Sequence, residues 1–158
     1  MTVRLAGPGD WDLLPAVERA ADGLFRDLGV ELPDDVSSVE ELRAAEFVLV
    51  AGAPPVGFAR VERVDGLAHL QQVSVHPAAA RRGVGSSLLA AVLDRAADRG
   101  FTGVTLTTFA DVAWNGPFYR RRGFTTMSDP GRELLGHVVA EEPLTRFGPR
   151  EVLVHPIR

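Results

Sequence analysis

Three strand-like segments in the middle of the chain are joined by tight turns, and a helix-forming segment follows them. Segments 47–51, 56–64 and 67–75 are rich in β-branched and other apolar residues. Gly-Ala-Pro-Pro separates the first two, and Asp65-Gly66, a dipeptide typical of two-residue hairpins, separates the last two. Residues 84–96 then repeat apolar side chains at helical spacing, and Gly100 ends the pattern. This order predicts a meander that continues into a strand–helix–strand unit, and therefore a mixed α/β sheet.

Flanking segments complete this predicted sheet. A short strand is expected over 3–5, followed by a helix capped by Asp10 whose apolar positions recur from Leu13 to Leu24. A second, shorter helix is expected to begin near Ser37 and Ser38, because Glu40 and Glu41 suit its first turn. Further elements are expected at 104–109 (strand), 115–122 (short helix) and 152–155 (strand).

Composition excludes several classes of protein. The 158 residues are 46% hydrophobic and carry a net charge of −4, which suits one domain over 1–158 and argues against a nucleic-acid partner. No apolar run is long enough to cross a bilayer and the N-terminus lacks a signal-peptide pattern, so we expect no membrane partner and a cytoplasmic location. There is no cysteine, and all 17 basic residues are arginine. Thiolate zinc sites, cysteine nucleophiles, lysine Schiff bases and GK[ST] phosphate loops are thereby excluded.

The loop between the third meander strand and the helix has the character of a phosphate site. Its residues are Arg81, Arg82, Gly83, Val84, Gly85 and Ser86, here called the phosphate cradle. Glycines allow a ligand to approach the backbone amides closely, and the following helix N-terminus and the arginines add positive potential. Gly-x-Gly alone is also compatible with a plain tight turn. Leu88 stands where a dinucleotide-binding G-x-G-x-x-G motif would have its third glycine.

Two segments resemble the GNAT superfamily of N-acetyltransferases. VSVHPAAARRGVGSSLL is similar to that family's acetyl-CoA segment, [QR]-x-x-G-x-[GA], with Gly83 and Gly85 matching and Ala80 replacing the usual Gln or Arg. TLTTFADVAWNGPFYRRRGF is similar to its second coenzyme A segment. The resemblance covers essentially the whole chain. It implies a mostly antiparallel sheet of about seven strands, flanked by helices and splayed at the strand that bears Val73, Ser74 and Val75.

The resemblance also implies an acetyl-CoA-dependent acyltransferase and assigns candidate residues. Backbone atoms of Val73, Ser74 and Val75 would pair with the pantetheine arm, and the cradle would bind the pyrophosphate. Asn115 fits an N-cap and, in the family, a cofactor contact. Tyr119, the chain's only tyrosine, is either an aromatic packed on the sheet or the general acid for the departing thiolate.

The base and the acceptor are less constrained. In the family a Glu or His early on the cofactor-binding strand often acts as base, which maps to His69; Glu62 and a water relay stay open, as does an ordinary half-exposed histidine. The acceptor would be a primary amine of a small molecule or peptide, recognised by the front helices and the loop around 28–36. Glu18 and Asp22, four residues apart, either hold a cationic amine or form an exposed acidic face.

Three further expectations concern mechanism and assembly. Without cysteine or lysine to carry an acetyl group, the amine should attack the thioester directly in a ternary complex. No metal is expected, because the remaining histidines lie in no ligand spacing; a homodimer is left open. Two alternatives remain: a non-catalytic module that senses acyl-CoA, and a nucleotide-binding protein that reads a different pyrophosphate.

Overall fold

Seven strands form the sheet, in the order β1-β2-β3-β4-β5-β7-β6. The structure is a computed structural model that describes residues 2–29 and 36–158. Helices flank a mostly antiparallel sheet, as predicted; β4 and β5 are a parallel pair, registered at Ala68↔Val104 and His69↔Thr105. The strands are β1 (Val3–Leu5), β2 (Phe47–Ala51), β3 (Gly57–Val64), β4 (Leu67–Val75), β5 (Gly103–Phe109), β6 (Thr125–Thr126) and β7 (Arg150–Pro156). The helices are α1 (Leu14–Asp27), α2 (Val39–Ala44), α3 (Val84–Asp98), α4 (Gly116–Arg120) and α5 (Arg132–Ala140).

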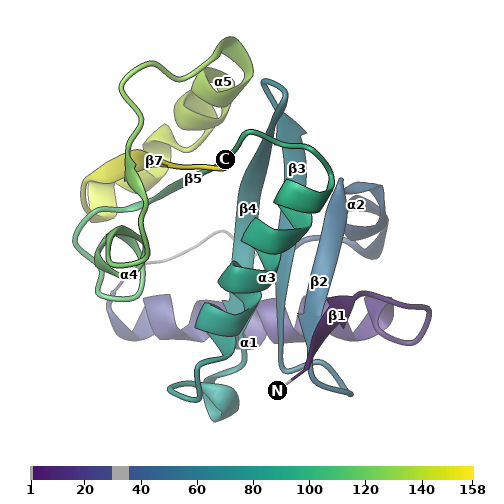
Figure 1. Cartoon of the computed structure of the whole chain (residues 1–158). Coiled ribbons are helices and arrows are strands. Elements are labelled where there is room, and N and C mark those ends of the chain that lie inside the picture. Colours follow the sequence, from purple (N-terminus) through teal and green to yellow (C-terminus); the bar gives the residue numbers. More distant parts are fainter. Residues whose placement is uncertain (1, 30–35) are drawn as a thin grey trace. The chain divides into compact units, whose positions relative to one another are not determined.

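The chain divides into two compact units, of which the first comprises Met1–Glu62 and Leu70–Arg95. Here β2 pairs with β1 and β3, both antiparallel. Helices α1 and α2 cover one face of these strands and α3 covers the other (Figure 1). The first face buries a cluster formed by Leu14, Val17, Leu42, Val48, Val50 and Phe58. On the other face α3 packs so closely that a Cβ added at Gly57 would lie 3.0 Å from Val84 and 3.3 Å from Leu88.

The predicted helix cap is present at α2 but not at the first helix of the chain. Ser38 caps α2 as expected: its hydroxyl accepts from the Glu41 amide, and the Glu41 carboxylate accepts from the Ser38 amide. The prediction that Asp10 caps the first helix was wrong. Its carboxylate instead pairs with Arg4 at 2.5 Å and accepts from the Gly7 amide at 2.7 Å, because an arginine on β1 lies within reach.

The second unit comprises Arg63–His69 and Ala96–Arg158. In it β5 pairs antiparallel with β7 over its whole length, and β7 also pairs with the short β6. Between β6 and β7 the chain forms α5, which the sequence analysis did not anticipate. None of the helices within residues 2–29 and 36–158 is long and apolar enough to cross a membrane.

The hairpin between β3 and β4 holds the first turn of α5. Asp65, at φ 54°, accepts from the Glu133 amide at 2.9 Å and the Leu134 amide at 3.0 Å. The Glu133 carboxylate accepts in return from the Asp65 amide at 3.0 Å. These contacts reproduce a capping box with the cap residue supplied by a distant segment. Gly131 is required beside it, because a Cβ there would lie 2.4 Å from an Asp65 oxygen.

Candidate functional site

The phosphate cradle has an exposed, unusually shaped backbone. Arg81 and Gly83 have φ values of 64° and 77°, in the left-handed region. Both residues are exposed, whereas Val84 is buried and anchors the start of α3. A left-handed conformation is unfavourable for arginine and persists only where the surroundings fix it, so it marks a candidate functional loop. Nothing lies within 4 Å of the position that a Cβ at Gly83 would take, which leaves room for a ligand.

His76 shapes the entry to this loop, a role that the sequence analysis did not assign. Its Nδ1 accepts from the Ala78 amide at 3.0 Å, and its carbonyl accepts from the Ala79 amide at 2.8 Å. The resulting 3₁₀ turn over Pro77–Ala79 ends β4 and directs the chain into the cradle. The signal for it was present, since a polar side chain before Pro can accept from an amide two residues later.

The end of β4 is suited to backbone rather than side-chain recognition. Ser74 is buried and its hydroxyl accepts from the Gln72 side chain at 3.1 Å. Val73 and Val75 are partly buried. The Ser74 hydroxyl is thus engaged internally, and the backbone role expected for Val73, Ser74 and Val75 stays a prediction.

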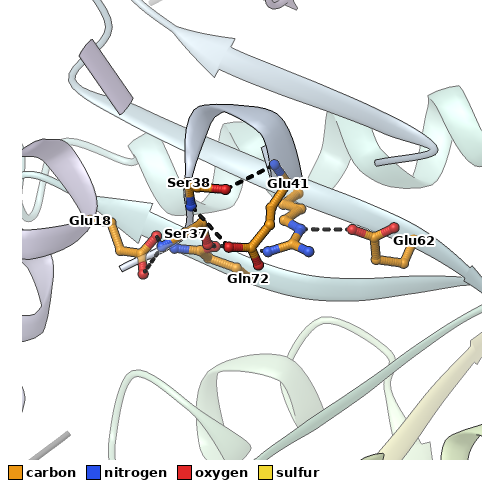
Figure 2. A network of polar contacts seen from close by, with 7 residues as sticks. Glu18, Ser37, Ser38, Glu41, Glu62 and Gln72 are labelled. Atoms are coloured by element: carbon orange, nitrogen blue, oxygen red, sulfur yellow. Dashed lines mark hydrogen bonds and ion pairs between the residues drawn. The ribbon is translucent and has the colours of Figure 1, made fainter. Parts of the chain in front are cut away.

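A polar network lies in the first unit, over strands β3 and β4 (Figure 2). Ser37, just before α2, joins its members: its amide donates to both Glu18 oxygens at 3.0 and 3.1 Å. Its hydroxyl donates to Gln72 Oε1 and accepts from Arg60 Nη1, both at 3.1 Å. Arg60 also pairs with Glu62 at 2.7 Å. The network therefore fixes α1 and the start of α2 against two strands.

The Glu18 and Asp22 carboxylates do not form the exposed acidic face weighed in the sequence analysis. Glu18 is only 7% exposed and Asp22 is partly buried. Burial, reinforced by the Glu18 charge, raises the pKa of Asp22 to about 6. The pattern could not reveal this burial, because it depends on the position of Ser37. Within the expected acceptor loop, residues 30–35 lie outside the described residues.

Asn115 faces a strand end instead of capping its helix. Asn115 precedes α4, but its side chain makes no capping hydrogen bond. Its Oδ1 accepts instead from the buried Thr108 hydroxyl near the end of β5. The tight approach of α4 explains the difference, since a Cβ at Gly116 would lie 2.6 Å from the Ala110 carbonyl oxygen. The capping prediction was wrong, and the amide is held beside the strand.

Tyr119 combines packing with a retained hydroxyl proton. Its ring meets Phe118 and Phe124 edge-on, at centroid distances of 5.1 and 5.6 Å. Burial raises the pKa of Tyr119 to about 12, so the phenol is fully protonated at neutral pH. The aromatic contacts fit the packing interpretation, and the protonated hydroxyl is compatible with a general acid.

His69 is buried rather than half-exposed. It is 2% exposed, and its Nδ1 lies 2.9 Å from the Thr105 hydroxyl on the parallel neighbour strand. Its ring centroid is 5.0 Å from that of His137 on α5. Burial, with a smaller effect from His137, lowers the pKa of His69 to about 4 and keeps the ring neutral at physiological pH.

The candidate residues fall into two groups. Val73, Ser74, Val75 and the cradle belong to the first unit, together with Glu18 and Glu62; His69, Asn115 and Tyr119 belong to the second. Over the described part of the chain, no group of three or more histidine, aspartate or glutamate side chains has an arrangement that could hold a metal ion.

Comparison with known proteins gives one family and many similar folds. Residues 15–124 match the Acetyltransferase (GNAT) family. A GNAT family acetyltransferase from Brucella melitensis, solved with acetyl-CoA, is 24% identical over 84% of this chain and 91% of its own, with a TM-score of 0.64. The ribosomal-protein-S18-alanine N-acetyltransferase of Escherichia coli is 20% identical over 99% and 93%, with a TM-score of 0.66.

A third structure is much longer than this chain. N-acetylglutamate synthase from Neisseria gonorrhoeae, complexed with coenzyme A and N-acetyl-glutamate, is 20% identical with a TM-score of 0.69. The match covers 99% of this chain but only 35% of that one. These likenesses agree with the fold that the sequence predicted.

Proposed function

Because the chain belongs to the acetyltransferase (GNAT) family, as predicted from its sequence, and is an acetyltransferase, we propose that it transfers acetyl from acetyl-CoA directly to a primary amine. The observation that carries the proposal is the exposed cradle, with its two left-handed positions at Arg81 and Gly83, ahead of α3. The acceptor would be a small-molecule or peptide amine, and the reaction cytoplasmic.

The cradle fits a pyrophosphate by its chemistry. Left-handed backbone positions turn amide groups outward, and the N-terminus of a helix as long as α3 adds positive potential. Arg81 and Arg82 supply full charges from exposed positions. Val73, Ser74 and Val75 would pair through their backbone with the pantetheine amides, and Asn115 would add a side-chain contact. Similar folds have been solved with coenzyme A or acetyl-CoA, which supports a ligand of this class but does not locate it.

Tyr119 would protonate the departing sulfur. Bound acetyl-CoA supplies a thioester, whose carbon–sulfur electron pair leaves on sulfur as the amine attacks. A thiol in water has a pKa of about 8.5, below that of the buried phenol, so the proton passes from Tyr119 to sulfur only as the carbon–sulfur bond breaks and negative charge develops. A phenol whose pKa is raised to about 12 holds its proton until then and recovers it from water afterwards.

The base function is assigned to the imidazole at His69, with Glu62 and a water relay as alternatives. The neutral ring that burial maintains has a lone pair to accept a proton. Glu62 is already paired with Arg60, which competes for its carboxylate. Glu18 and Asp22 on α1 are the acidic groups available to a cationic acceptor, and a family relative that acetylates a protein's alanine illustrates a peptide acceptor.

An acceptor screen with a free-thiol readout tests this proposal. Incubation with acetyl-CoA and a panel of diamines, amino acids and peptides should release coenzyme A with at least one amine, in step with acetylation of that amine. Binding of acetyl-CoA by calorimetry without release for any amine would instead favour the non-catalytic sensing module. A thermal shift from ATP as large as that from coenzyme A would favour a nucleotide-binding protein.

A further inference from the structure

One chain of hydrogen bonds runs from the front helices to the strand that is expected to bind the cofactor. Gln72, on β4, is its middle member (Figure 2). Its Oε1 accepts from the Ser37 hydroxyl at 3.1 Å, and its Nε2 donates to the Ser74 hydroxyl at 3.1 Å. The Ser37 amide in turn donates to Glu18 on α1. These four residues and the cradle belong to the first compact unit, so every contact in the chain is internal to that unit.

Arg60 on β3 orients this chain of hydrogen bonds. A guanidinium donates hydrogen bonds and accepts none. Because Arg60 Nη1 donates to the Ser37 hydroxyl at 3.1 Å, the proton of that hydroxyl points away from the arginine, and Gln72 Oε1 accepts it. The NH₂ group of the same side-chain amide then faces Ser74. Both ends of the Gln72 amide are thus engaged, which holds this side chain in one position on β4.

The chain is shielded from water at both ends. Ser37 is 8% exposed and Ser74 is 4% exposed, and Gln72 is partly buried between them. A buried polar group that loses its hydrogen-bond partner costs more free energy than an exposed one, because water does not replace the partner. A fully satisfied buried network therefore makes its surroundings rigid. In this protein it holds the start of α2 and the end of β4 at a fixed spacing.

We infer that Gln72 is a positioning residue of the acetyl transfer. This inference rests on the proposed function, in which the front helices receive the acceptor amine and the backbone of Val73, Ser74 and Val75 binds the pantetheine arm. Gln72 contacts both segments, the first through Ser37 and the second through Ser74. Direct attack requires the amine nitrogen to lie close to the thioester carbon, and a misplacement of about 1 Å can lower the rate about 10²-fold. Gln72 sets the spacing of the two segments and acts through these serines.

Two substitutions break this chain at different points. Gln72→Met keeps the length of the side chain but loses both of its hydrogen bonds. Ser37→Ala removes only the hydroxyl, since the amide of residue 37 still donates to Glu18 and the neighbouring Ser38 still caps α2. Gln71→Met is the matched control, because Gln71 is exposed and successive side chains of a strand point to opposite faces.

We expect kcat to fall by about 10–100-fold in Gln72→Met and in Ser37→Ala, with the Kd of acetyl-CoA in calorimetry nearly unchanged and the control like wild type. The double variant should lose no more than the larger single loss, because both changes break the same chain. Gln72→Glu should keep kcat within about fivefold of wild type, since a carboxylate can accept from both serine hydroxyls. Losses below about threefold in both variants, or losses that multiply in the double variant, would overturn the inference. A lower urea midpoint with unchanged kcat would likewise overturn it, because it would mean a role in stability alone.

A second readout does not depend on turnover. In an NMR spectrum, Ser37→Ala should shift the Ser74 amide resonance, because the contact between the two serines passes through Gln72, and this shift should be absent when Gln72→Met is also present. An unchanged Ser74 resonance in Ser37→Ala would overturn the linkage. If wild type acetylates no amine, the proposed function fails and the inference fails with it. If wild type is active and both variants keep its kcat, only the inference fails.

Discussion

Replacing His69 by asparagine should remove a pH dependence of stability that the buried ring creates. The pKa of His69 is lowered to about 4 in the folded chain, against about 6.5 for an unfolded histidine. Between these values the unfolded chain binds a proton that the folded chain does not. The free energy of unfolding therefore falls as the pH falls through this window, with a limiting slope of about 1.4 kcal/mol per pH unit.

The magnitude follows from the two pKa values. From about pH 7.5 to about pH 5, the His69 contribution lowers the free energy of unfolding by about 2 kcal/mol. That is a large part of a typical stability of about 5–15 kcal/mol. Asparagine keeps a polar group near the Thr105 hydroxyl but does not titrate, so His69→Asn should lack this loss.

Urea unfolding of wild type and His69→Asn at several pH values measures the effect. Asp22 acts with the opposite sign: its pKa is raised to about 6, so folding favours its protonated form and stability rises as the pH falls through that value. This contribution is present in both proteins and cancels in the difference. Thr105→Val is the matched control, expected to lower stability by about 1 kcal/mol at every pH with the slope retained.

The difference between wild type and His69→Asn should shift by about 2 kcal/mol across this range, in favour of the variant at low pH. Parallel stability profiles for the two proteins would refute the reasoning. They would mean that the ring is protonated in the folded chain, and therefore better hydrated than its burial indicates.

Three further predictions concern the cradle, the acid and the hairpin. Gly83→Glu should abolish acetyl-CoA binding in calorimetry, because it adds a negative charge beside the phosphates. Gly83→Ala tests the left-handed backbone alone and should weaken binding less. If both variants bound acetyl-CoA as tightly as wild type, the cradle would not be part of the site. Tyr119→Phe keeps the aromatic contacts but removes the hydroxyl, so kcat should fall by about 10²–10⁴-fold while cofactor affinity changes little. A loss of kcat under about threefold would mean that Tyr119 has only a packing role. Gly131→Ala should lower the free energy of unfolding by about 1–3 kcal/mol, because the added Cβ would collide with Asp65. An unchanged urea midpoint would show that the contact of Asp65 with the start of α5 does not stabilise the fold.

Elements whose signals are local were predictable from the sequence. The boundaries of β2 and β4 match the segments 47–51 and 67–75, and the Ser38 cap fixes the start of α2 as expected. Each depends on residues adjacent in the chain: alternating or continuous apolar runs, Asp65-Gly66, and a serine three residues before a glutamate. The cradle is a local signal of the same kind, and its binding role stays a prediction.

Features that depend on distant residues were missed. Helix α5 takes its cap from Asp65, 68 residues before Glu133, and no pattern near Arg132 reveals this. The contact between His69 and His137 was missed because the two residues lie on different elements. The Asp10 and Asn115 side chains accept hydrogen bonds from Arg4 and Thr108, respectively, instead of from the helix end beside them. Local capping preference of about 1 kcal/mol is readily overridden by such contacts.

The central claim, direct acetyl transfer from acetyl-CoA to an amine, is tested by following where the acetyl group goes. The protein is incubated with acetyl-CoA alone, its intact mass is measured, and an amine found in the screen is then added. The account predicts no acetyl on the folded enzyme beyond slow labelling of the N-terminus, followed by coenzyme A release equal to acetylated amine, with intersecting double-reciprocal plots. A stoichiometric acetyl adduct on the enzyme, together with parallel plots, would contradict it and indicate a covalent intermediate on a hydroxyl side chain.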